Sequence, residues 1–106
     1  MSAVVLLEFS IAPLEKGTSV SEYVARSLKI IDASGLDYRL HAMGTIVEGE
    51  LDQVLEVLRD CMKAMAADCD RITCTAKMDY RRGHSGRLAT KVESVVEKLD
   101  TQLKTL

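Results

Sequence analysis

Residues 51–81 are LDQVLEVLRDCMKAMAADCDRITCTAKMDYR, and within them the spacing of apolar residues changes from helical to alternating. Across residues 51–65 apolar side chains recur at helical spacing, which predicts an amphipathic helix. Across residues 71–81 apolar and polar residues alternate strictly, which predicts a strand with one apolar and one polar face. The pattern therefore indicates helices packed on one face of a sheet.

The residues before this stretch complete the same architecture. Residues 3–11 are rich in apolar residues on both parities, which predicts a central strand. Ser19 and Glu22 form a capping-box pattern for a first helix, and Gly35 is a suitable stop. Residues 36–41 and 45–48 then predict a hairpin that turns at Gly44.

Downstream, the loop 82–86 precedes a last helix whose apolar residues run from Leu88 to Leu103. The predicted order is β-α-β-β-α-β-α. Its first six elements match the split βαβ pattern. The sequence therefore predicts an α+β fold, a ferredoxin-like βαββαβ sandwich with an additional C-terminal helix. We expect residues 1–106 to form a single domain.

Composition excludes several classes of protein. The chain of 106 residues is 47% hydrophobic and 28% charged, which is typical of a soluble globular protein. A formal net charge of -2 argues against nucleic acid as a partner. No apolar run approaches the ~20 residues needed to span a bilayer, so no membrane association is expected. The three cysteines lack paired spacing and no export signal is visible, which predicts a cytoplasmic protein.

The face of the sheet opposite the first two helices has a mixed character. Val4 and Leu6 lie on that parity together with Glu8 and Ser10. The two apolar residues favour cover by another subunit, although a solvated face is the plain alternative. The apolar stripe of the last helix must also be buried, either on this face or on a neighbouring chain. We therefore expect a homo-oligomer.

Glu48 is the most unusual polar residue in the predicted hairpin. It follows Ile46 and Val47 in a short apolar strand, where a carboxylate is unfavourable without a partner. The partner could be a ligand cation or a structural pair with an arginine such as Arg39.

A second polar group follows the last predicted strand. Arg81, Arg82, His84 and Arg87 form a small basic cluster. They could hold an anion with the help of the N-terminus of the last helix, or they could line a solvated loop. Metal binding is not expected, because His41 and His84 are far apart and the cysteines lack metal-ligand spacing.

The chain resembles the family of small thiamine-binding proteins with a ferredoxin-like fold, over nearly its whole length. The Gly-Thr-x-x-Glu-Gly segment is the most specific part of this resemblance. The segments that carry it are Ala12-Pro13, Ser19-Val20, Ser34-Gly-Leu-Asp-Tyr38, Met43-Gly-Thr-Ile-Val-Glu-Gly-Glu50, Arg71-Ile-Thr and Lys77-Met-Asp-Tyr-Arg81.

The resemblance implies a binding protein, not an enzyme, whose ligand is thiamine or its hydroxymethylpyrimidine half, with no other cofactor required. It also implies a homodimer, or a homotetramer of dimers with packed sheets, and a ligand at or near a subunit interface. Glu48 is the first candidate to bind the aminopyrimidine or balance the thiazolium charge. Thr45 is expected to add a hydroxyl contact. Ser10, Tyr38 and Arg81 complete the candidate set.

Strand geometry complicates this set of residues. Thr45 and Glu48 point to opposite faces of an ideal strand. A bulge near Gly44, or a site built from two subunits, would let both contact one ligand.

Three other functions fit parts of the pattern. A small enzyme could use Arg81 and Arg82 on a phosphorylated substrate, although no glycine-rich phosphate loop follows the first strand. An RNA-binding sheet would need exposed aromatics on its central strands, where Phe9 is the only one. A purely structural oligomerisation module is the third alternative.

Overall fold

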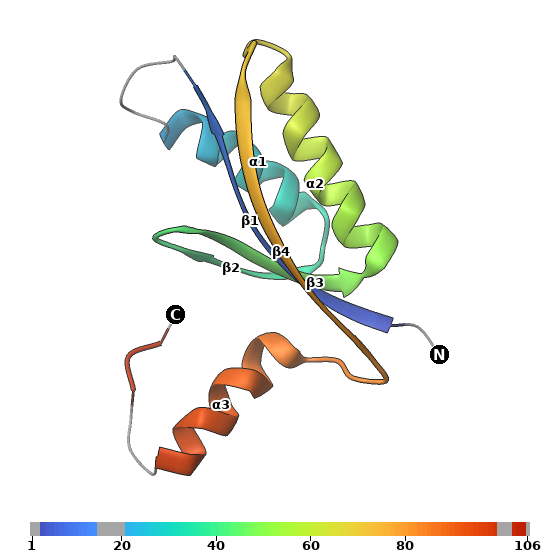
Figure 1. The fold of residues 1–106 in the computed structure, drawn as a ribbon, viewed down its shortest axis with the longest axis vertical. Helices are drawn as coiled ribbons and strands as arrows, with labels where there is room; N and C mark the ends of the chain where they lie inside the picture. Colours follow the sequence, from blue (N-terminus) through green and yellow to red (C-terminus); the bar gives the residue numbers. More distant parts are fainter. Residues whose placement is uncertain (1–2, 15–20, 100–102, 106) are drawn as a thin grey trace.

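The computed structural model describes residues 3–14, 21–99 and 103–105, which form four strands and three helices (Figure 1). Their order along the chain is the predicted β-α-β-β-α-β-α. The elements are β1 (Ala3–Pro13), α1 (Ser21–Ala33), β2 (Asp37–His41), β3 (Gly44–Glu50), α2 (Leu51–Ala66), β4 (Ile72–Arg82) and α3 (Arg87–Leu99). None of these helices is long and apolar enough to cross a bilayer.

The four strands form one antiparallel sheet in the order β2-β3-β1-β4. This order and the two helices on one face confirm the predicted ferredoxin-like α+β fold with an additional C-terminal helix. Leu7 lies opposite Val47 and Met78, on the face that α1 and α2 cover. The alternate residues, such as Leu6, point to the other side of the sheet, which we call the open face.

The hydrophobic core lies between the sheet and the helices α1 and α2. On β1 every second residue from Val5 to Ile11 is buried, as the alternation predicts. The helical spacing of α2 brings its buried face onto β1 and β3. The buried cluster consists of Val5, Leu7, Phe9, Ile11, Ile31, Val47, Val54, Val57, Cys61 and Met65.

Helix α3 lies on the opposite side of the sheet from α1 and α2 (Figure 1). It contacts β3 and β2, which confirms that the last helix can cover the open face. The cover is incomplete, because Val92, Val95 and Leu99 remain 41%, 51% and 56% exposed. The helix ends at Leu99 and Leu103 lies outside it, so the sequence pattern overestimated its length.

Two further expectations need comment. The predicted N-cap Ser19 lies outside the described residues, and α1 is described from Ser21 onward. Leu6, whose apolar side chain we expected to favour cover by another subunit, is only 5% exposed within one chain. The first turn of α3 lies beside it, since Leu6 and Arg87 line the same cavity.

Candidate functional site

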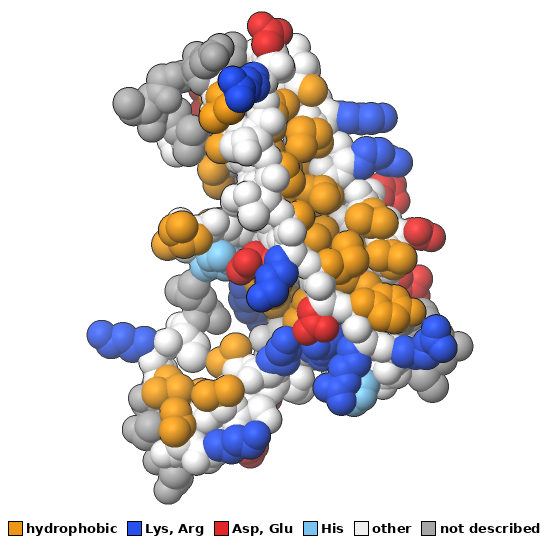
Figure 2. Space-filling view, in the orientation of Figure 1, with side chains coloured by type: hydrophobic (Ala, Val, Ile, Leu, Met, Phe, Trp, Pro, Cys, Tyr) orange, Lys and Arg blue, Asp and Glu red, His pale blue; other side chains and the backbone are white. Residues whose placement is uncertain are grey.

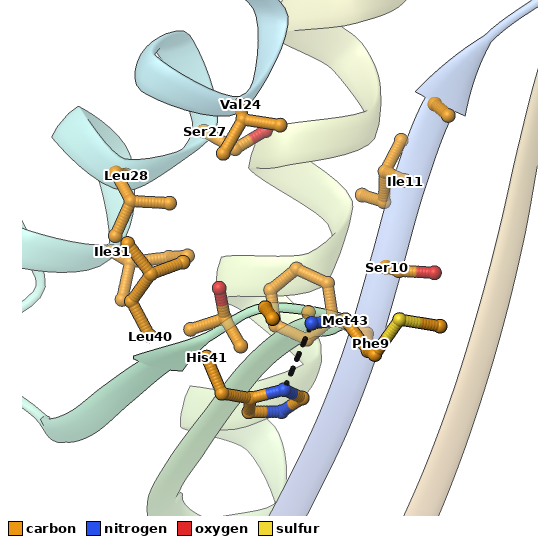
Figure 3. A pocket seen from close by; sticks show the side chains of 14 residues that line it. Phe9, Ser10, Ile11, Val24, Ser27, Leu28, Ile31, Leu40, His41 and Met43 are labelled. Atoms are coloured by element: carbon orange, nitrogen blue, oxygen red, sulfur yellow. Dashed lines mark hydrogen bonds between the residues drawn. The ribbon is translucent and has the colours of Figure 1, made fainter. Parts of the chain in front are cut away.

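A cavity of about 220 Å³ lies between α1 and the hairpin formed by β2 and β3 (Figure 3). We call it the α1 pocket. Residues 9–12 of β1, residues 40–45 of the hairpin and four residues of α1 line it. The α1 residues are Val24, Ser27, Leu28 and Ile31, whose spacing places them on one face of the helix.

The walls of the α1 pocket are mainly apolar. Figure 3 shows Leu28 and Ile31 of α1 on one side of the cavity and Phe9 and Ile11 of β1 on the other. Met43, which is 83% exposed, lies at the hairpin end of the pocket. Such walls suit a flat, apolar ring, and a few polar atoms among them would fix its orientation.

Ser27 supplies one of these polar atoms. The residue is 7% exposed, and its Oγ is buried without a hydrogen-bond partner. A buried hydroxyl without a partner is unfavourable, and most buried polar groups in proteins have one. A ligand in the α1 pocket would give this hydroxyl the partner that it lacks in the chain alone.

Thr45 supplies a second hydroxyl from the opposite wall. It lies opposite Phe9 on β1 and Leu40 on β2, on the helix side of the sheet, and is 5% exposed. The preceding Gly44 brings β3 close to β1, because a Cβ at this position would lie 2.7 Å from the carbonyl oxygen of Phe9. A glycine is therefore required where the hairpin enters the pocket.

His41 connects the α1 pocket with the open face. Its Nδ1 accepts a hydrogen bond from the backbone N–H of Met43 at 3.2 Å, which closes the hairpin turn (Figure 3). Its Nε2 lies 3.2 Å from Glu8 Oε2 on the open face. His41 lines both the α1 pocket and a second cavity on the open face.

This second cavity, the open-face cavity, has a volume of about 410 Å³ and lies between the sheet and α3. Leu6, Ile46, Leu88 and Val92 form its apolar part. Its charged lining consists of Glu8, Arg39, Arg87 and Lys91.

Glu48 joins β3 to the start of α3 on the open face. Its Oε2 accepts a hydrogen bond from the backbone N–H of Arg87 at 2.8 Å, and the residue is 7% exposed. Arg87 is the first residue of α3, so the carboxylate occupies the N-terminal end of the helix, where negative charge is favourable. The buried carboxylate therefore has a partner within the chain, and this partner is not Arg39.

Asp79 holds α3 to β4. Its Oδ2 accepts hydrogen bonds from the Arg87 guanidinium and from Lys91 Nζ, the latter at 2.8 Å. These two cations lower the pKa of Asp79 to about 2. The first two turns of α3 are thus attached to β3 by Glu48 and to β4 by Asp79.

The structure separates the residues that the sequence analysis grouped together. Thr45 and Ser10 border the α1 pocket, but the Ser10 hydroxyl points away from the α1 side chains (Figure 3). Glu48 lies on the open face, opposite Leu6, and Arg81 is exposed on the same face opposite Val4. The predicted opposite orientation of Thr45 and Glu48 is thus confirmed, with an unbroken register between β1 and β3.

Tyr38 already uses its hydroxyl within the chain. The Tyr38 O–H donates a hydrogen bond to Asp32 Oδ1 at 2.9 Å. This bond to a carboxylate raises the pKa of Tyr38. The side chain packs against the core and does not line the α1 pocket.

Sequence reasoning did not single out Ser27 and did not place His41 at the α1 pocket. Ser27 interrupts the apolar face that Val24, Leu28 and Ile31 form, and this interruption was the available signal.

Among the described residues, no group of three or more His, Cys, Asp or Glu side chains could hold a metal ion. Cys61 is buried in the core, and burial raises the pKa of its thiol to about 11.

Comparisons with known proteins agree with this architecture. The family model described as "Thiamine-binding protein" matches residues 7–96. The UPF0045 protein MJ1052 of Methanocaldococcus jannaschii is 33% identical over 93 residues, which cover 88% of this chain and 93% of that protein. A UPF0045 protein of Mycobacterium tuberculosis is 34% identical over 92 residues, covering 86% of this chain and 90% of the relative.

Solved structures show the same fold. The crystal structure of MJ1052 matches with a TM-score of 0.81 at 34% identity and covers 92% of this chain and 99% of that chain. A Thermotoga maritima protein that has been proposed to act in thiamine biosynthesis or salvage matches with a TM-score of 0.75 at 19% identity. It covers 87% of this chain and 98% of that chain, and at this identity the likeness concerns the fold alone.

Proposed function

Because this chain belongs to the thiamine-binding protein family, we propose that it binds thiamine, or its hydroxymethylpyrimidine half, without catalysing a reaction. In this proposal the pyrimidine ring occupies the α1 pocket. The observation that carries the placement is the unpartnered hydroxyl of Ser27, buried between apolar walls.

The chemistry of the pocket suits an aminopyrimidine. Phe9 offers an aromatic side chain to a flat ring, and Ser27 and Thr45 offer hydroxyls that can each donate and accept a hydrogen bond. An amino group and ring nitrogens need both kinds of partner. The cavity of about 220 Å³ is smaller than the pockets that enclose drug-sized ligands, so it fits one ring while the thiazolium half lies outside.

The position of the pocket also fits a site near a subunit interface. Leu40 and Met43, which border it, are 50% and 83% exposed. Val95 and Leu99 on α3 are likewise exposed and apolar. We propose that a second copy of the chain covers α3 and the open face, and that His41 links this interface to the α1 pocket.

An enzymatic role on a phosphorylated substrate has less support. The anion-binding position at the start of α3 holds the Glu48 carboxylate, and the Arg87 guanidinium is bonded to Asp79. A phosphate at this position would have to displace both contacts.

The three cysteines are free thiols, which supports the proposed cytoplasmic location.

Isothermal titration calorimetry with the separate halves of thiamine tests the proposal. We expect thiamine and hydroxymethylpyrimidine to bind with one site per chain, and the hydroxyethylthiazole half to bind at least tenfold more weakly. Mass spectrometry of the freshly purified protein should detect the same pyrimidine compounds if they co-purify. Binding of the thiazole half alone, or no heat with any of the three compounds, would reject the proposed ligand.

A further inference from the structure

Two buried nitrogen atoms without hydrogen-bond partners belong to residues that line the open-face cavity. Among the described residues, three buried side-chain atoms lack a partner, namely Ser27 Oγ, His41 Nε2 and Arg87 Nη1. Ser27 lines the α1 pocket, whereas His41 and Arg87 both line the cavity between the sheet and α3. Because most buried polar groups in proteins are paired, two exceptions around one cavity indicate a site for a ligand.

The unpaired nitrogen of His41 is a hydrogen-bond donor. Its Nδ1 accepts the backbone N–H of Met43, and a neutral imidazole that accepts at one nitrogen carries its proton on the other. The Nε2 lies 3.2 Å from Glu8 Oε2, but the two atoms are not oriented for a hydrogen bond. A ligand that meets this nitrogen must therefore offer an acceptor atom.

Arg87 is the more deeply buried of the two residues and carries a charge. It is 6% exposed, its guanidinium donates to Asp79 through Nη2, and its Nη1 has no partner. Buried guanidinium groups bind carboxylates by strong, charge-assisted hydrogen bonds. A ligand at Nη1 would leave the Asp79 contact in place, and Glu48 would keep the backbone N–H at the start of α3.

The charges around the cavity suit a ligand with a single negative charge. Arg39, Arg87 and Lys91 line it together with one carboxylate, that of Glu8. Asp79 balances one more of these cations, because it accepts hydrogen bonds from both Arg87 and Lys91. The guanidinium of Arg39 donates to a neutral backbone carbonyl. With the histidine neutral, one positive charge is left over, which fits a monoanion better than a doubly charged phosphate.

The size and walls of the cavity suit a small organic molecule. Its volume of about 410 Å³ lies within the usual range of small-molecule pockets. Leu6 and Ile46 of the sheet and Leu88 and Val92 of α3 form apolar walls. Figure 2 shows a hollow between α3 and the hairpin of β2 and β3, bordered by basic side chains and a histidine. Apolar walls with a few convergent polar groups are typical of ligand sites.

From these observations we propose that the open-face cavity binds a small organic anion, with one carboxylate on an apolar body that carries a further acceptor atom. The carboxylate lies against Arg87, Arg39 and Lys91, and the apolar body lies between the sheet and α3. The acceptor atom meets Nε2 of His41. This ligand differs from the aminopyrimidine of the α1 pocket in both charge and position, so the two proposals fail or hold separately.

Calorimetry of the full chain with three probe compounds tests this chemistry. Quinoline-6-carboxylate has a carboxylate, a flat apolar body and a ring nitrogen that accepts a hydrogen bond. We expect it to bind at one site per chain, about tenfold more tightly than the uncharged quinoline-6-carboxamide. It should also bind more tightly than 2-naphthoate, which lacks the ring nitrogen. Binding no tighter than that of either other compound, or none detectable at about 1 mM, would overturn the proposal.

Charge variants test where the carboxylate lies. Lys91→Gln and Arg39→Gln should each weaken the binding of quinoline-6-carboxylate about tenfold. Glu8→Gln should strengthen it about threefold, because a like charge is removed, and misfolding could not produce such a gain. Lys98→Gln, the same change on an exposed part of α3 outside the cavity, is the matched control and should bind like wild type. Equal affinities of Lys91→Gln and Lys98→Gln, or weaker binding by Glu8→Gln, would contradict the proposed site.

Discussion

At the scale of single residues, we expect the Ser27 hydroxyl to contribute to ligand binding but not to folding. Its hydroxyl is buried in the α1 pocket without a partner, so the folded chain gains no hydrogen bond from it. A ligand would give the Ser27 hydroxyl a hydrogen-bond partner. Removing the hydroxyl would cost the unliganded protein no hydrogen bond. Ser27 is therefore an exception to the preference for fully paired buried polar groups, and such exceptions are typical of functional sites.

Ser27→Ala should therefore act oppositely on stability and affinity. We expect the midpoint of chemical denaturation of the unliganded protein to stay unchanged or rise, because an unsatisfied hydroxyl is removed. The affinity for hydroxymethylpyrimidine should fall about two- to twelvefold, the loss of one hydrogen bond of about 0.5–1.5 kcal/mol. The matched control is Ser10→Ala, whose hydroxyl points away from the pocket and should not affect binding. Equal losses for both variants would show that Ser27 has no special role.

Glu48 illustrates a residue whose partner lies within the chain. Its carboxylate receives the first backbone N–H of α3, so Glu48→Gln should weaken the attachment of α3 by about 1 kcal/mol. Hydrogen exchange of the amides in the first turns of α3 should become faster, while the affinity for hydroxymethylpyrimidine stays within twofold of wild type. A tenfold loss of affinity without faster exchange would instead make Glu48 a ligand contact.

At the scale of elements, the sequence predicted the strands and helices well because their periods are strong. The alternation along β4 and the helical spacing in α2 follow directly from which side chains meet the core. The sequence could not predict how completely each face is covered. Met78 and Tyr80 have the parity of core residues but remain exposed, because coverage depends on where α2 crosses the sheet.

The candidate site was predictable only in part for a similar reason. The resemblance marked the hairpin and Thr45, which lines the α1 pocket, and strand parity separated Thr45 from Glu48. The contact between Glu48 and Arg87 depends on how the loop after β4 returns α3 to the open face, and 39 residues separate the two in sequence. The proposed pocket also depends on Ser27, which lies outside the segments that carry the resemblance.

The attachment of α3 should depend on acidity. Asp79 has a folded-state pKa lowered to about 2 by Lys91 and Arg87, below its ordinary value of about 3.9. Its contribution to stability is therefore complete above about pH 4 and is lost as pH falls toward 2. The exchange of amide hydrogens in α3, corrected for intrinsic rates, should become faster as the pH falls from 5 to 2. In the Asp79→Asn variant, the amides of α3 should exchange faster than in wild type already at pH 5. If the exchange in this variant still depended on pH as it does in wild type, Asp79 would be excluded as the cause.

At the scale of the whole molecule, a single copy leaves apolar side chains exposed among the described residues. They include Leu40 and Met43 at the hairpin, Leu99 on the outer side of α3, and Met78 and Tyr80 on β4. Exposed apolar surface of this kind is typical of subunit interfaces, so we expect the chain to form a homo-oligomer.

Leu99→Asp should weaken the proposed contact between α3 and a second copy of the chain. Leu99 is 56% exposed on α3, and a charge at this position opposes burial by a partner. We expect light scattering to show a smaller assembly mass than for the wild-type protein. Ser94→Asp, on another side of the same helix, should keep the wild-type mass. A Leu99→Asp protein of unchanged mass would show that α3 does not contact another copy.

The most direct test of the central claim is a crystal structure of the full chain grown with hydroxymethylpyrimidine. We predict density for the ring in the α1 pocket, beside Phe9 and within hydrogen-bond distance of Ser27 Oγ and Thr45 Oγ1. The bond from the Arg87 N–H to Glu48 should remain as it is without ligand. Density for the ring in the open-face cavity against Glu48, with the α1 pocket empty, would contradict the account.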